Sequence, residues 1–79
     1  HPARFSEQDH LVRAGEPARQ VAFVQEGVVR AYFTTPEGKE YNKTFFTAPE
    51  FAGAYAALVT QTESRISVQC LTACRLLLA

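Results

Sequence analysis

The 79-residue sequence is poor in cysteine and has no long hydrophobic run. Its two cysteines, Cys70 and Cys74, have no matching pair of histidines, which argues against a disulfide framework and against a Cys/His zinc site. We expect both to be reduced thiols in apolar surroundings, as free cysteines usually are. No apolar run approaches the roughly 18 residues of a membrane span, and no signal-peptide pattern opens the sequence. The chain is therefore expected to be soluble and cytoplasmic.

An excess of charge of either sign is also missing. Lys plus Arg and Asp plus Glu both number 8, so the formal net charge is zero. No long-range electrostatic field then draws the chain to nucleic acid or to a membrane surface. If the whole protein binds DNA, we expect a domain absent from this sequence to do it.

Groups that carry chemistry are few. His1 and His10 have no partner at the spacing of metal ligands. Thr60, Ser64 and Ser67 would act as nucleophiles only beside a base, and no histidine lies near them in sequence. We expect no catalysis, no bound metal and no cofactor.

The length allows one modest core. A chain of 79 residues with 47% hydrophobic content buries only about 60 to 65% of its unfolded surface, so residues 1–79 are predicted to form a single domain. The apolar run Leu76-Leu77-Leu78-Ala79 ends the sequence without a turn or cap, and burying it needs a partner surface. We expect the sequence to be a piece of a longer protein.

The spacing of turn-forming residues in the sequence is typical of an all-β domain. Turn signals at Gly15-Glu16-Pro17, Glu26-Gly27 and Pro36-Glu37-Gly38 divide it into segments of strand length. The best-defined turn is TPEGKE, where Pro36 and Gly38 favour a hairpin. The expected strands are Ala3–Ser6, His10–Arg13, Gln20–Gln25, Val28–Thr34, Glu40–Phe46 and Ser64–Leu71. Only Phe51 to about Val59, rich in Ala and preceded by Pro49, favours a helix.

Alternation along the expected strands predicts which side chains share a face. The predicted groups are Val29, Ala31 and Phe33 opposite Arg30, Tyr32 and Thr34; Tyr41 and Phe45 opposite Glu40, Asn42 and Thr44; and Ser64, Ile66, Val68 and Cys70 opposite Arg65, Ser67 and Gln69. Tyr41, Phe45, Phe46 and Phe51 are expected to be core aromatics, although Phe51 and Tyr55 are also candidates to line a pocket.

This layout resembles the cyclic-nucleotide-binding sensor domain of the Crp/Fnr family of bacterial transcription regulators. The matching segments are LVRAGEPARQVAFVQEGVVRAYFTTPEGKEYNKTFF and EFAGAYAALVTQTESRISVQCLTACRLLL. They share with the family a Gly-Glu turn at Gly15-Glu16, a strand ending at Gly27 before a long hairpin arm, and an acidic residue with Gly at Glu37-Gly38. The resemblance implies a β-roll of the double-stranded β-helix, jelly-roll-like type with one short helix in the phosphate-binding cassette.

In the family, the cassette binds a cyclic phosphate with the backbone N–H groups of its helix N-terminus. An Arg on the following strand supplies the counter-charge, and a Glu in the first helical turn holds the ribose. Phe51 and Gly53 match the start of the cassette, but Ala54 stands where the family has the Glu. Ser64 takes the position of the Arg, and Arg65 follows one residue later. If Ser64 faces the pocket, strand parity turns Arg65 away.

The resemblance therefore implies a sensor domain whose ligand contacts differ from the usual ones. The candidate ligand-binding residues are Phe51, Gly53, Ala54, Tyr55, Ser64 and Arg65. We expect a regulatory domain without catalysis that binds a small-molecule effector or nothing, in a protein that forms a homodimer and binds DNA through a domain absent here. One alternative is a cyclic AMP or cyclic GMP binder in which Arg65 replaces the missing Arg after a register slip or bulge. A second is a cupin-like enzyme on the same kind of roll.

Overall fold

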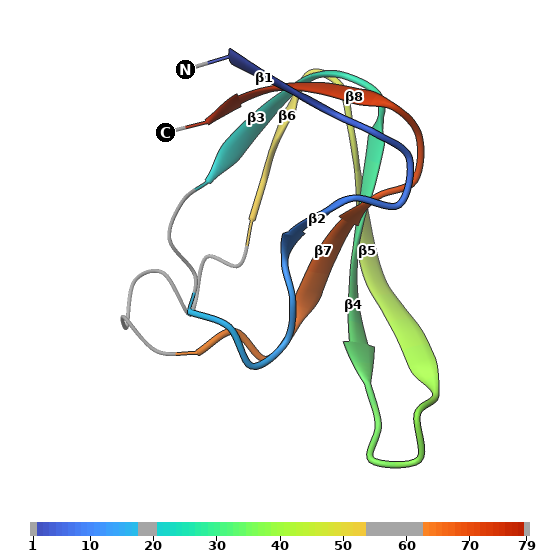
Figure 1. Ribbon diagram of the computed structural model, residues 1–79. Coiled ribbons are helices and arrows are strands. Elements are labelled where there is room, and N and C mark those ends of the chain that lie inside the picture. The colour runs from blue at the N-terminus through green and yellow to red at the C-terminus, as the bar shows by residue number, and fades with distance from the viewer. Residues whose placement is uncertain (1, 18–20, 54–62, 79) are drawn as a thin grey trace.

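The regular elements of the described part of the chain are all strands. The computed structural model describes residues 2–17, 21–53 and 63–78. In chain order (Figure 1) the strands are β1 (Pro2–Phe5), β2 (His10–Val12), β3 (Ala22–Glu26), β4 (Val28–Thr34), β5 (Glu40–Thr47), β6 (Glu50–Ala52), β7 (Ser67–Cys70) and β8 (Cys74–Leu78).

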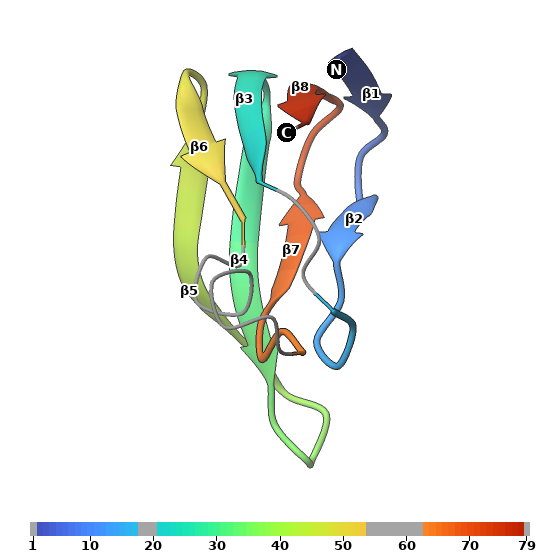
Figure 2. The ribbon, with the colours of Figure 1, turned by 90° about the vertical axis from the view of Figure 1, so that its left-hand side faces the viewer.

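The strands form two four-stranded sheets. Sheet A has the order β1-β8-β3-β6 and sheet B the order β2-β7-β4-β5, with antiparallel pairing throughout. Figure 2 shows sheet A in the upper part of the view and sheet B in the lower part. The chain crosses repeatedly from one sheet to the other, so the predicted all-β roll is confirmed.

The core lies between the two sheets and is made of small and branched side chains. Its buried members are Val12, Ala22, Val24, Val29, Ala31, Ala52, Val68, Cys70, Cys74 and Leu76. Because side chains alternate along a strand, these residues define the inner face of each sheet. The buried state predicted for Cys70 and Cys74 is confirmed, and both are free thiols.

The β4–β5 hairpin is the longest antiparallel unit, and it extends beyond the other described strands at the lower end of Figure 1. The Gly38 N–H donates to the Thr35 carbonyl at 2.9 Å, and Thr35 N–H donates to the Lys39 carbonyl at 2.8 Å. Pro36 supplies the fixed φ of the first corner and Gly38 a φ of +86°. The predicted hairpin is confirmed.

Most predicted strands are present with small differences at their ends. The range expected for β4 is the observed one, and β1, β2 and β5 each differ from expectation by a residue at one or both ends. The prediction of a strand from Ser64 is wrong, because β7 begins only at Ser67. The helix expected from Phe51 is wrong at its start, since Phe51 and Ala52 pair with β3 as part of β6; its continuation from residue 54 lies outside the described residues.

The predicted faces hold along most of β4 but fail on β5. The register shifts so that Thr44 pairs with Ala31 whereas Asn42 pairs with Tyr32, which leaves Lys43 as an extra, bulged residue. Tyr41 and Phe45 therefore lie on opposite faces, contrary to the alternation read from the sequence.

The prediction that the aromatic residues fill the core is also mostly wrong. Tyr41, Phe45 and Phe51 are exposed, and only Phe46 packs against the core. Ser67, expected on an outer face, is nevertheless buried, and its hydroxyl accepts a hydrogen bond of 2.9 Å from the backbone N–H of Ala14. The part of the chain that the structure describes contains no candidate membrane-spanning helix.

Candidate functional site

The first two candidate residues lie at the end of β6. Phe51 points to the outer face of sheet A, where its ring meets that of Phe23 edge to face at a centroid distance of 5.0 Å. The neighbouring Ala52 and Gly53 are buried. Phe51 is thus held by β3 and remains 59% exposed, while Gly53 lies in a buried bend. Ala54 and Tyr55 lie outside the described residues.

Ser64 is bound into the fold by its own backbone and hydroxyl. Its hydroxyl donates to the Ile66 carbonyl at 2.6 Å and accepts from the Ile66 N–H at 3.2 Å. Its backbone N–H donates to the Glu16 carbonyl, and its carbonyl accepts from the Gly15 N–H, both at 2.8 Å. The residue is only 2% exposed. Ser64 therefore joins the Gly15-Glu16 turn to the entrance of β7.

Arg65 follows in an exposed bend before β7. Strand parity does not govern its direction, because Ser64, Arg65 and Ile66 precede the first strand residue, Ser67. The local turn closed by the Ser64 hydroxyl buries Ser64 and leaves Arg65 exposed. Whether any of the candidate residues contacts a ligand stays a prediction.

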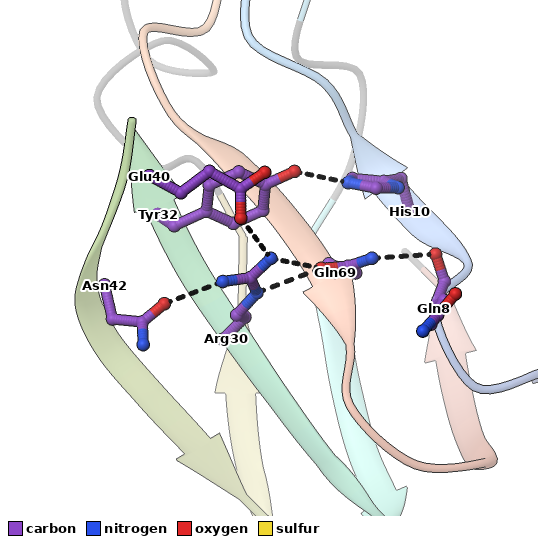
Figure 3. Close-up of polar contacts among 7 residues, drawn as sticks. All are labelled: Gln8, His10, Arg30, Tyr32, Glu40, Asn42 and Gln69. Atoms are coloured by element: carbon purple, nitrogen blue, oxygen red, sulfur yellow. Dashed lines mark hydrogen bonds and ion pairs between the residues drawn. The ribbon is translucent and has the colours of Figure 1, made fainter. Parts of the chain in front are cut away.

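A polar network on the outer face of sheet B was not predicted as a unit. At its centre (Figure 3) the Arg30 guanidinium donates to Gln69 Oε1 from Nε at 2.9 Å and from Nη2 at 2.7 Å. It also donates to Asn42 Oδ1 at 2.9 Å and forms an ion pair with Glu40 at 3.0 Å. The Arg30 side chain is only 16% exposed, so these strong hydrogen bonds join β7, β4 and β5.

The same network extends to β2 through two aromatic rings. The Arg30 guanidinium carbon lies 3.9 Å from the centre of the Tyr32 ring, a cation–π distance. The Tyr32 hydroxyl and His10 Nε2 share a hydrogen bond of 2.7 Å, as Figure 3 shows. The alternation of side chains along the strand predicted that Arg30 and Tyr32 share one face, but the sequence did not indicate that Gln69 and His10 would contact them.

Two titratable groups have shifted pKa values with clear causes. Burial, and then the positive charges of Arg13 and Arg30, lower the pKa of His10 below its usual 6.5. Its Nδ1 is buried without a hydrogen-bond partner among the described residues. Burial, and then contact with the Cys74 thiol, raise the pKa of Cys70 to about 12, which makes this thiol a poor nucleophile at neutral pH. In the described ranges no three His, Cys, Asp or Glu side chains form a metal-binding group.

Comparison with known proteins shows which domain family the chain matches. Residues 2–79 match the family model described as a cyclic nucleotide-binding domain. A search of curated protein sequences finds no match.

Solved structures with the same fold include three regulators or regulator domains. The catabolite activator protein of Thermus thermophilus superposes with a TM-score of 0.87 at 18% identity, covering 99% of this chain and 36% of that one. The sensor domain of the transcriptional regulator DNR from Pseudomonas aeruginosa gives 0.88 at 19% identity, with 99% and 52% covered. The N-terminal domain of a transcriptional regulator from Streptomyces coelicolor A3(2) gives 0.86 at 24% identity, with 100% and 56% covered. The chain thus spans about a third to a little over half of these chains.

Proposed function

Because this chain belongs to the family of cyclic nucleotide-binding domains, we propose that it is the non-catalytic, ligand-sensing domain of a Crp/Fnr-type transcription regulator. Similarity of fold to the sensor domain of DNR and to a catabolite activator protein supports this proposal. The domain binds a small-molecule effector, and the whole protein dimerises and binds DNA through segments outside this sequence. Effector binding acts by changing the balance between two arrangements of the dimer.

The effector, in this proposal, is not a cyclic nucleotide held by its phosphate in the family's usual way. The observation that carries this is Ser64, which stands where the family has its phosphate-binding Arg. Its hydroxyl is already bonded to Ile66, and its side chain is buried. A phosphate brought to this place without a guanidinium would lose its hydration and gain no counter-charge, which costs several kcal/mol.

A thermal-unfolding titration with cyclic AMP and cyclic GMP tests this proposal. A ligand that binds only the folded chain stabilises it by about 2.7 kcal/mol at 100 times its dissociation constant. We expect each cyclic nucleotide to stabilise the wild-type chain no more than its nucleoside, adenosine or guanosine, does at the same concentration. Saturable stabilisation by either cyclic nucleotide clearly beyond that of its nucleoside would overturn the proposal.

The family membership itself favours one competing function, a cyclic nucleotide binder that uses Arg65. It predicts saturable binding of cyclic AMP that is lost in Arg65→Ala. The matched control is Arg75→Ala, because Arg75 is also an exposed arginine but lies on β8 in an ion pair with Glu26. If both variants lose binding equally, Arg65 is not the phosphate ligand. Metal analysis of the purified chain tests the cupin-like enzyme, which requires stoichiometric metal.

A further inference from the structure

Two aromatic rings lie stacked and exposed at the far end of the β4–β5 hairpin. Phe33 on β4 and Tyr41 on β5 are register partners, with ring centres 5.5 Å apart and planes inclined by 24°. Phe33 is 42% exposed and Tyr41 47% exposed. Large apolar side chains left in water at neighbouring positions mark a candidate contact surface.

The pair lies on the inner face of sheet B, the face that forms the core further along the strands. Val29 and Ala31 precede Phe33 at two-residue spacing on β4, and both are fully buried. Phe33 therefore continues the same face beyond the core. The register partner of Ala31 on β5 is Thr44, which is exposed and adds a hydroxyl to this face.

We propose that Phe33 and Tyr41 form a stacking platform for the planar heteroaromatic ring of the effector, and this inference rests on the proposed sensing function. Offset stacking is a favoured arrangement of aromatic rings. Because each ring gives one face to its neighbour, a third planar ring can continue the stack on the exposed side. Every heteroaromatic base has such a π-face, so the platform selects ring shape and needs no phosphate contact.

The hairpin is held rigidly for this role from its opposite face. Tyr41 lies between Glu40 and Asn42, and both of these side chains are bonded to the Arg30 guanidinium. Phe33 follows Tyr32, whose ring lies against Arg30 and whose hydroxyl is bonded to His10. The residues beside the platform are thus fixed on the outer face, as Figure 3 shows. A ligand meeting a platform that is already ordered loses little free energy in ordering it.

The size of the surface favours a small ligand over a second protein copy. An aromatic side chain buries 150 to 250 Å² when fully covered, so the exposed parts of the two rings amount to roughly 150 to 200 Å². A stable protein interface buries about 800 Å² on each partner. One face of a purine or an isoalloxazine is enough to cover the free face of one ring of the pair; a second copy of this chain would need a much larger surface.

The test uses adenosine, guanosine and riboflavin as planar probes without phosphate, and ribose 5-phosphate as a probe without a ring. Binding is followed by NMR of the aromatic side chains of the wild-type chain. We expect at least one planar probe to shift the Phe33 and Tyr41 ring signals with saturation, and ribose 5-phosphate to leave them unchanged. Whichever of Phe33→Leu and Tyr41→Leu removes the ring on which the probe stacks should weaken that binding about tenfold or more, because stacking is lost while the apolar character stays.

Phe45→Leu is the matched control. Phe45 is an exposed aromatic of the same hairpin, 53% exposed, but its register partner is Arg30 and it lies on the outer face. Its substitution should leave the affinity unchanged, and the NMR spectrum of each variant shows whether the fold is kept.

Two results would overturn the platform. One is that none of the three planar probes shifts the Phe33 and Tyr41 signals. The other is equal affinity in Phe33→Leu, Tyr41→Leu and wild type. A probe that stabilises the chain against thermal unfolding without moving these rings refutes the platform and leaves the sensing function standing. Cyclic AMP binding that depends on Arg65 but not on the rings refutes both proposals.

Discussion

A methyl group added at Gly27 should destabilise this fold more than the same change at Gly15 or Gly38. Gly27 joins β3 to β4 with a φ of +104°. A Cβ there would lie 2.6 Å from Cys74 Sγ, 2.7 Å from the Ala73 carbonyl oxygen and 2.9 Å from Thr72 Oγ1. The backbone oxygen at the entrance of β8 has to move to make room, because it is not the end of a flexible side chain.

Gly38→Ala separates backbone strain from overpacking, the two causes of the destabilisation expected for Gly27→Ala. Gly38 also has a positive φ, +86°, but nothing lies within 4 Å of a Cβ built there. Its substitution should cost only the backbone strain of about 1–2 kcal/mol. Gly27→Ala adds an overpacking cost of about 1–3 kcal/mol, for a total of about 2–5 kcal/mol. Domains of this size are stable by roughly 4–12 kcal/mol, so Gly27→Ala removes a large part of the free energy of unfolding.

Urea unfolding, followed by far-UV circular dichroism, measures the difference. With a slope of about 1 kcal/mol per molar urea, the midpoint of Gly27→Ala should lie about 2 M below that of Gly38→Ala. Midpoints within about 0.5 M of each other would refute the reasoning, because the steric overlap of a Cβ at Gly27 with the residues at the start of β8 would then not lower the free energy of unfolding.

Two further predictions concern the polar network of sheet B. Arg30→Met removes the hydrogen bonds to Gln69, Asn42 and Glu40 and should lower the free energy of unfolding by about 2 kcal/mol. Arg75→Met breaks a more exposed ion pair with Glu26 and should lower it by under about 1 kcal/mol. Urea titration of both variants checks this, and equal losses would contradict it. Burial lowers the pKa of His10 in the folded chain below 6.5, so near this pH the unfolded chain binds more protons than the folded chain. The stability that comes from neutral His10 is therefore present above pH 6.5 and is lost as the pH falls through the folded pKa. Thermal midpoints between about pH 8 and pH 5 should therefore fall more steeply for wild type than for His10→Gln, and identical slopes would exclude His10 as the cause.

Local features of the sequence were enough to predict most of the strands. Alternation with period two and the turn chemistry of Pro36 and Gly38 act between near neighbours, so β4 and its hairpin followed without knowledge of the fold. The ordered glycines at the turns carried the resemblance to the family, and the family model matches residues 2–79.

Elements that depend on distant partners were missed. The Ala-rich segment after Pro49 favours a helix by propensity, but Phe51 and Ala52 pair with β3, a strand far away in sequence. The bulge at Lys43 changes which face each β5 residue occupies, and no local rule marks it. Tyr41 and Phe45 were therefore expected together in the core and lie exposed on opposite faces.

For the candidate site, the sequence alone was enough to predict the substitutions, because its resemblance to the family implies that Ala54 and Ser64 take the places of a Glu and an Arg. The tertiary structure decided what surrounds Ser64: it is hydrogen-bonded to Ile66, Gly15 and Glu16 and is buried, whereas Arg65 is exposed. It also decided the stacked pair of Phe33 and Tyr41. The physical reason is that composition and spacing act along the chain, whereas register between strands brings together residues that the chain holds far apart.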